Sequence, residues 1–141
     1  MINILTGVSN SAAALSAERI RMEVTSQNIA NANTTRGLDG KPYQRQQVVF
    51  QTHLDSFGGA AGAPASMEVA RIEKDRRPPR LIHMEGHPDA DPVTQMVAVP
   101  NINIHEEWAD YITASRAFEA NLAVVKNARA MAIQTLAISH R

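Results

Sequence analysis

The sequence contains no cysteine, which excludes disulfide bridges and thiolate metal sites. It also lacks a net charge, because 14 basic residues balance 14 acidic ones. A neutral chain gives no indication of a nucleic-acid partner or an anionic membrane surface, since both favour a basic face. No apolar run approaches the length that spans a bilayer, so we expect no membrane insertion.

Aromatic residues are scarce, at 4% of the chain, whereas alanine is the most frequent residue. Large aromatic side chains normally account for much of a buried core, so this composition buries less apolar area per residue. Small alanine side chains do, however, let helices approach closely. We therefore expect helices that depend on neighbours for part of their stability.

The pattern of a secretory signal peptide is missing from residues 1–20. No Lys or Arg precedes Arg19, and polar residues such as Asn3, Thr6 and Ser9 interrupt the apolar run. A signal peptide needs a basic start and an unbroken apolar core. We therefore expect no cleaved signal peptide.

An apolar period of seven residues runs through the N-terminal part of the chain. Its members are Leu5, Val8, Leu15, Met22 and Ile29, where Leu5 stands three positions before Val8. No proline interrupts this stretch. A sustained seven-residue period is typical of a helix that packs through a narrow coiled-coil seam.

The C-terminal part, from Asn103 to about Ser139, carries the same period without Gly or Pro and predicts one long helix. Asn103 suits a helix N-cap, and Glu106 stands at the third helical position, as in a capping box. The apolar stripe of this helix consists of two rows, which are Ile104, Tyr111, Phe118, Val125 and Ala132, and Trp108, Ser115, Leu122, Arg129 and Leu136.

The middle of the chain differs in kind, because all seven prolines lie between positions 42 and 100. Prolines end long helices, so we expect short strands and turns here. The candidate strands are 43–54, 67–72, 80–84 and 93–99, the candidate turns are 38–43 and 86–92, and 58–66 is a small-residue loop.

Together these patterns predict a mainly α fold with a small β part. The two terminal helices are expected to pair as an antiparallel coiled coil, with a β-rich middle inserted between them. The expected divisions are 1–36 for the N-terminal core helix and its Asn-rich turn, 37–100 for the β-rich outer region, and 101–141 for the C-terminal core helix.

Residues 83–91, HMEGHPDAD, hold the densest group of titratable side chains. His83 and His87 suggest a metal-dependent enzyme as one alternative. However, Gly86 and Pro88 break any helix that would align the ligands, and the zinc-hydrolase motif H-E-x-x-H is not met. The chain also has no nucleophile elbow and no phosphate-binding loop. We therefore interpret the segment as a turn and expect no catalytic site, metal or cofactor.

The stretch SQNIANANTTRG, residues 26–37, is rich in amide side chains. One asparagine is enough to end a helix, since Asn tolerates the left-handed conformation. The remaining amides and hydroxyls could form a hydrogen-bond network between subunits. From the residues alone, a plain helix stop and a helix stop that is also an interface are equally favoured.

Four segments resemble bacterial flagellar axial proteins, which form the rod and the hook. SQNIANANTT (26–35) resembles their Asn-rich signature, and ASRAFEANLAVVKNARAM (114–131) resembles their C-terminal helix motif. GKPYQRQQVVFQ (40–51) and GHPDADPVTQMVAVPNINIHEEW (86–108) resemble more narrowly the proximal rod proteins of the FlgC type. The resemblance extends over nearly the whole chain.

This resemblance implies a structural subunit of the flagellar proximal rod, the drive shaft that transmits torque from the motor to the hook, and no enzymatic activity. Such proteins leave the cell through the flagellar type III export apparatus without a cleaved signal, and they polymerise through their terminal helices in the periplasm. The implied partners are other proximal and distal rod subunits and the adaptor between the export gate and the MS ring at the rod base. A free coiled-coil adaptor is the alternative function.

The resemblance also implies which residues meet neighbouring subunits. The residues with an interface or motif role would be Asn28, Ile29, Ala30, Asn31, Asn33, Thr34, Thr35, Ser115, Arg116, Phe118, Glu119 and Asn121. The predicted helix seam, expected to meet within the subunit or between neighbours, comprises Leu5, Val8, Leu15, Met22, Ile104, Trp108, Tyr111, Leu122, Val125 and Leu136.

Overall fold

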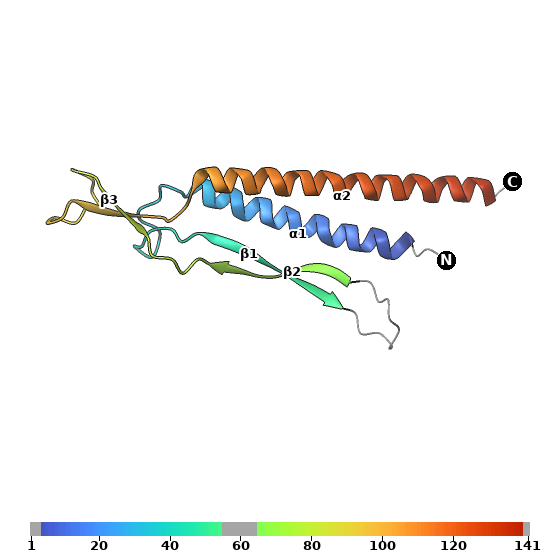
Figure 1. The fold of residues 1–141 in the computed structure, drawn as a ribbon, viewed down its shortest axis with the longest axis horizontal. Helices are drawn as coiled ribbons and strands as arrows, with labels where there is room; N and C mark the ends of the chain where they lie inside the picture. Colours follow the sequence, from blue (N-terminus) through green and yellow to red (C-terminus); the bar gives the residue numbers. More distant parts are fainter. Residues whose placement is uncertain (1–3, 55–64, 140–141) are drawn as a thin grey trace.

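Two long helices and two small antiparallel sheets make up the fold. A computed structural model describes residues 4–54 and 65–139, and Figure 1 shows its elements. Helix α1 spans Ile4–Ala30 and helix α2 spans Ile104–Ser139. The helices lie side by side along the longest axis and run antiparallel, so that α1 begins at the end of the molecule where α2 ends. The predicted fold class, mainly α with a small β insertion, is confirmed.

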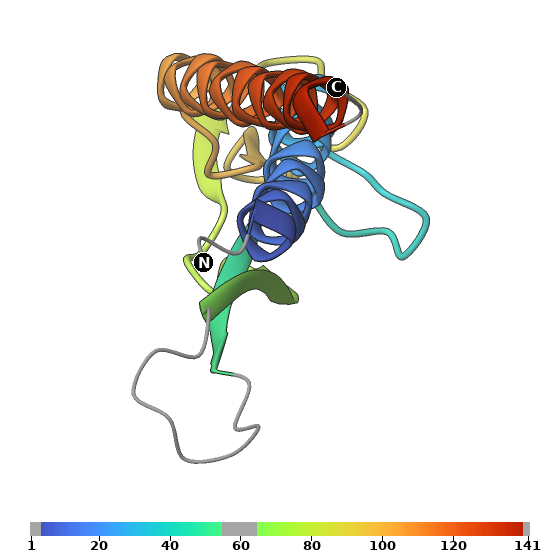
Figure 2. The same ribbon diagram turned by 90° about the vertical axis from the view of Figure 1, so that its right-hand side faces the viewer.

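The strands form two separate hairpins between the helices. Strand β1 (Gln46–Leu54) pairs antiparallel with β2 (Ala65–Lys74), and β3 (Arg80–His83) pairs antiparallel with β4 (Met96–Val99). In Figure 2, which views the molecule along its helices, α1 lies between α2 and the β1–β2 hairpin, and α1 contacts both. Helix α1 is therefore the central layer of this part of the molecule.

All four predicted strands are present, with different limits. The strands predicted over 43–54, 67–72 and 80–84 correspond to β1, β2 and β3. The loop predicted over 58–66 lies mostly outside the described residues, and its last two positions belong to β2.

The strand predicted over 93–99 is shorter than expected, because its first residues belong to a turn. The Asp91 carboxylate accepts hydrogen bonds from the backbone N–H groups of Val93 (2.8 Å) and Thr94 (3.0 Å). Gln95 then adopts a φ of 54°, in the left-handed region that extended strands do not use. Strand β4 consequently begins only after this residue.

Helix α2 begins where the sequence predicts. The Asn103 Oδ1 atom accepts the backbone N–H of His105 at 3.1 Å, which caps the helix. Glu106 bonds the side-chain amide of Asn103 at 2.9 Å instead of its backbone N–H, so the capping box is only partly formed. Within the described residues, neither α1 nor α2 combines the length and apolar character that a membrane crossing requires.

The deepest part of the helix packing uses small and polar side chains rather than large apolar ones. In α2 the buried residues are Glu107, Ala114 and Ala128, which are spaced by multiples of seven. This row differs from both predicted rows, and Trp108 and Leu136 of the predicted seam are exposed. Alanine at the contact allows the two helix backbones to approach closely, which pushes larger side chains to the flanks of the contact.

Candidate functional site at the helix junction

Asn28, in the last turn of α1, joins three parts of the chain. Its side chain is 1% exposed, and its Nδ2 atom donates to the Gln46 carbonyl at 2.7 Å and to Glu107 Oε2 at 2.9 Å. Its Oδ1 atom accepts the Gln46 backbone N–H at 2.9 Å and the Tyr43 hydroxyl at 3.1 Å. An amide side chain has two donor hydrogens and two acceptor lone pairs, and all four are used here.

The Asn28 side chain acts as a neighbouring strand would for the first residue of β1. It both donates to and accepts from the backbone of Gln46, the first residue of β1, as a neighbouring strand would do. Its fourth bond reaches α2 through Glu107. Every hydrogen-bonding position of the Asn28 side chain therefore has a partner within the chain, and its predicted role between subunits stays a prediction.

Glu107 is a buried carboxylate, 1% exposed, with a partner for each oxygen. Its Oε1 atom accepts from Arg45 Nε at 2.6 Å, and its Oε2 atom accepts from Asn28. Removing one partner of a buried pair leaves a buried charge uncompensated, which typically costs about 3–5 kcal/mol. The pair therefore holds α2 against the segment that leads into β1.

Further charges continue this contact along the two helices. Asp110 lies 3.8 Å from Arg45 Nη2 and 3.5 Å from Arg21 Nη2, which links α2 back to α1. Arg21 also lies 3.9 Å from Glu18, whose Oε2 atom is buried and has no hydrogen-bond partner among the described residues. The Asp110 side chain is half exposed, so solvent screens these outer pairs and each contributes little.

The surroundings of Tyr43 at this junction favour its neutral form. Burial of the phenol raises the pKa of Tyr43 above its ordinary value of 10.0, and the negative charge of Glu107 raises this pKa further. Both causes disfavour the phenolate. The neutral hydroxyl therefore remains available as the donor to Asn28 throughout the neutral pH range.

Asn31 and Thr34 end helix α1. The Asn31 backbone N–H and its side-chain Nδ2 both donate to the Gln27 carbonyl, at 3.0 and 2.8 Å. The Thr34 hydroxyl donates to Asn31 Oδ1 at 3.2 Å, while the Thr34 N–H bonds the Asn31 carbonyl at 3.1 Å. The helix-stop role expected of one asparagine therefore falls to Asn31.

Thr35 and Arg36 attach this turn to the β3–β4 hairpin. The Thr35 hydroxyl donates to Asp89 Oδ2 at 2.8 Å, and Arg36 Nε lies 3.3 Å from Asp89 Oδ1. The His87 Nδ1 atom in turn accepts the Asp89 backbone N–H at 3.1 Å. Among the described residues, no group of three or more His, Asp or Glu side chains is placed to hold a metal ion.

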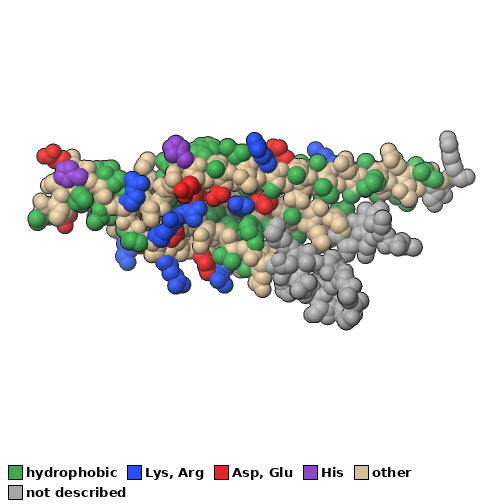
Figure 3. Space-filling view, viewed as in Figure 1, with side chains coloured by type: hydrophobic (Ala, Val, Ile, Leu, Met, Phe, Trp, Pro, Cys, Tyr) green, Lys and Arg blue, Asp and Glu red, His purple; other side chains and the backbone are tan. Residues whose placement is uncertain are grey.

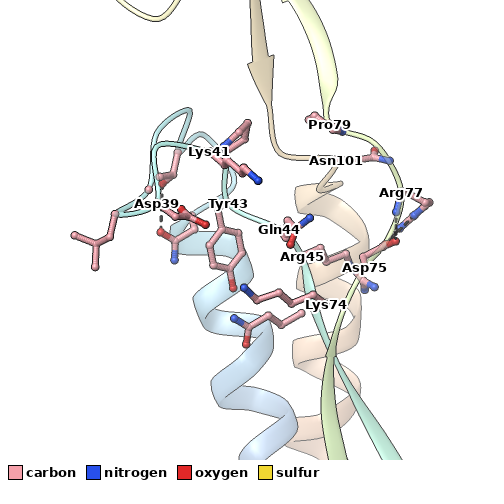
Figure 4. Close-up of a pocket in the computed structure, with 16 residues that line it drawn as sticks. Asp39, Lys41, Tyr43, Gln44, Arg45, Lys74, Asp75, Arg77, Pro79 and Asn101 are labelled. Carbon is pink, nitrogen blue, oxygen red and sulfur yellow. Dashed lines mark hydrogen bonds and ion pairs between the residues drawn. The ribbon is translucent and has the colours of Figure 1, made fainter.

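A surface cavity of about 460 Å³ lies beside the junction. Figure 4 shows Lys41, Tyr43 and Lys74 around it, with the Asp75–Arg77 ion pair on the far wall. Asn31 and Thr34 also line this cavity. The Asn-rich stretch (residues 26–37) thus faces a recess that is open at the surface.

The remaining motif and seam residues vary in exposure. In the Asn-rich stretch Ile29 is half-buried, whereas Ala30 and Asn33 are exposed. The half-buried members elsewhere are Val8, Leu15, Met22, Tyr111, Ser115, Phe118, Asn121, Leu122 and Val125, and the exposed ones are Ile104, Trp108, Arg116, Glu119 and Leu136. The side chain of Leu5 lies outside the described part of the structure.

Sequence reasoning missed the roles of Tyr43, Arg45 and Glu107. Glu107 lies in the first turn of α2, where a carboxylate suits the positive end of the helix dipole, and Arg45 lies 62 positions before it. No local spacing connects the two residues. The only available signal was that Tyr43 and Arg45 fall within the motif of residues 40–51.

Comparisons with known proteins agree with this architecture. The family model "Flagella basal body rod protein" matches residues 9–36, and the model "Flagellar basal body rod FlgEFG protein C-terminal" matches residues 91–138. A flagellar basal-body rod protein FlgC of Borreliella burgdorferi is 35% identical, with 97% of this chain and 98% of that protein aligned.

The FlgC protein of Yersinia enterocolitica is 36% identical over 89% of this chain and 90% of its own, and that of Bacillus subtilis is 32% identical over 91% and 93%. This chain belongs to the FlgC family of flagellar basal-body rod proteins. It is therefore a structural rod protein and not an enzyme, and neither the metal-dependent enzyme nor the free adaptor is favoured. The buried polar junction of this FlgC protein is thus a structural site.

Replacing Asn28 by aspartate should destabilise the chain by about 2–5 kcal/mol. The aspartate loses both N–H donors and places a second carboxylate beside Glu107. Urea unfolding of the purified chain, followed by Trp108 fluorescence, measures this loss. Asn33→Asp is the matched control, because Asn33 is exposed and should change stability by less than about 0.5 kcal/mol. Equal unfolding midpoints for the two variants would contradict the role given to Asn28.

Alkaline pH should weaken the junction through Tyr43. Because the folded-state pKa is raised, the stability that the neutral phenol contributes is fully present below pH 10.0 and is lost as pH rises through the folded pKa. Urea midpoints measured at increasing pH should fall more steeply for the wild-type chain than for Tyr43→Phe, which has no group to ionise there. Parallel pH profiles would show that Tyr43 is not the titrating group.

Proposed function

We propose that this chain polymerises through its terminal helices into the proximal rod and there transmits torque from the motor to the hook. Family membership supports the rod assignment. The observation that carries the role of the helices is an exposed apolar row on α2, in which Val124, Met131 and Ile138 recur every seven residues. Such a row lies on one helix face and suits packing against a helix of a neighbouring subunit.

The same proposal divides the chain by role. Residues 1–36 and 101–141 form the core of the shaft, and residues 37–100 form its outer region. Contacts that continue from subunit to subunit without closing generate a helical shaft. The buried junction around Asn28 and Glu107 supports this role, because it fixes the core helices to the outer strands within each subunit.

The Asn-rich stretch and the C-terminal motif contribute polar contacts between subunits in this proposal. Asn33, Arg116 and Glu119 are exposed, and Asn31 and Thr34 line the open cavity beside the junction. Their exposure supports contacts with a neighbour, in contrast to the buried Asn28. The neighbours are other proximal and distal rod subunits, together with the adaptor between the export gate and the MS ring at the rod base.

The proposed route to this position is the flagellar type III export apparatus. The rod then assembles across the periplasm. In this proposal the chain uses no metal or cofactor and has no nucleic-acid partner. Support for this route comes from family membership alone.

The variant Val124→Asp tests the helix surface. In a strain that lacks the chromosomal gene, the wild-type chain should restore rods to purified basal bodies, as seen by electron microscopy, and should restore swimming. Val124→Asp should restore neither, because a charge in the exposed row opposes helix packing between subunits, while the variant chain is still exported. Leu38→Asp is the control, since Leu38 is fully exposed but lies in a turn outside the helices. Normal rods with Val124→Asp would show that this row is not an assembly surface.

A further inference from the structure

The β3–β4 hairpin projects beyond the helix pair at one end of the molecule (Figure 1). Its tip (residues 81–95) exposes apolar side chains, with Val93 87% and Leu81 63% exposed, and Met84 also exposed. Figure 3 shows hydrophobic side chains at this end next to acidic and histidine side chains. Exposed apolar side chains grouped on a projection indicate a contact with another molecule.

Hydrogen bonds within the tip and to the end of α1 restrain the tip. The Asp91 carboxylate accepts the Val93 N–H at 2.8 Å, and Asp89 is bonded by the Thr35 hydroxyl at 2.8 Å, which anchors the hairpin to the end of α1. A preorganised surface loses little conformational entropy when a partner covers it. The tip is therefore suited to docking without rearrangement.

The opposite end of the molecule carries exposed apolar side chains next to basic ones. In Figure 1, α2 continues past the beginning of α1. On its last turns Lys126, Arg129, Ile133 and Leu136 are exposed and are spaced by three, four and three positions, which places them on one helix face. These four positions lie beside the row of Glu107, Ala114 and Ala128 that is buried in the helix packing, so they form a separate, exposed face of α2.

The charges of the two ends are opposite. Residues 81–95 contain no Lys or Arg, and Glu85 and Asp91 are exposed there. Residues 120–139 contain no Asp or Glu, whereas Lys126 and Arg129 are exposed. Apolar side chains flanked by opposite charges favour contact between such surfaces and fix its orientation.

The C-terminal end of α2 belongs to a segment that other rod proteins also contain. The family model that matches residues 91–138 is described as the C-terminal part of the rod proteins FlgEFG, and its match continues through Ile133 and Leu136. A neighbouring rod subunit can therefore present a C-terminal helix end of the same kind. The partner of the hairpin tip would therefore be an apolar helix end that carries basic residues.

We propose that the hairpin tip docks on the exposed C-terminal helix end of the adjoining rod subunit along the long axis. Leu81, Met84 and Val93 pack against the apolar side chains of that helix, and Glu85 and Asp91 face its basic residues. The proposal rests on the proposed assembly of this chain into the rod. The contact joins two different surfaces, so it can repeat from one subunit to the next along the shaft.

Photo-cross-linking in assembled basal bodies tests the proposal. The photoreactive residue p-benzoylphenylalanine replaces Val93 in flagellated cells, the cells are irradiated, and cross-linked peptides from purified basal bodies are identified by mass spectrometry. Cross-links to the C-terminal helix of a rod subunit are expected. Cross-links that map elsewhere, or none in basal bodies with intact rods, would overturn the proposal.

Two further probe positions complete the cross-linking experiment. The same probe at Leu38, which is also fully exposed but lies in a distant turn, should not link to a C-terminal helix end. Leu81 offers a second probe position if the Val93 variant does not assemble. Absence of the wild-type chain itself from purified basal bodies would instead contradict the rod function, so the two failures are distinguishable.

A charge reversal tests the electrostatic part of the contact. Glu85→Lys should lower the yield of the Val93 cross-link by about two- to fivefold, as expected for one exposed charge pair. Glu68→Lys is the matched control, because Glu68 is an exposed glutamate on β2, away from the tip. An unchanged yield with Glu85→Lys would show that the charges do not contribute to docking.

Discussion

The amide of Asn28 is the contact on which the arrangement of this FlgC protein depends. It bonds the backbone of Gln46 as a second neighbouring strand would and, through Glu107, connects the end of α1 to the beginning of α2. A buried network in which every member has its partners stabilises one geometry over others, because each shift leaves a polar group unpaired. The angle at which the outer strands leave the helix pair is therefore set inside the subunit, before any neighbour binds.

Because this junction is internal, the outer surfaces remain available for the proposed contacts with other subunits. Ala17 and Ala114 permit close helix packing with little apolar area, while larger side chains such as Val124, Met131 and Leu136 stay exposed. The isolated chain thus leaves apolar surface uncovered along α2 and at the hairpin tip. The proposed transmission of torque would benefit from this division, since rigid subunits transmit a load that flexible junctions would absorb.

Part of this structure follows from the sequence. The seven-residue period predicts both helices, and the prolines confine the strands to the middle, because both signals are local. The buried row of α2 was not predicted, because large apolar residues such as Trp108 were expected in the contact that Ala114 occupies. Glu107 and Arg45 lie 62 positions apart, and only the folded chain brings them to 2.6 Å. The family motif drew attention to Asn28 without revealing that its bonds are internal.

The most direct test is a cryo-electron microscopy map of the assembled rod at a resolution that shows side chains. The account predicts that the Asn28 amide lies between the Gln46 backbone and the Glu107 carboxylate of its own subunit, as it does in the single chain. The hydrogen bonds should be the same in every copy along the shaft. An Asn28 side chain that reaches across to a neighbouring subunit would contradict the account.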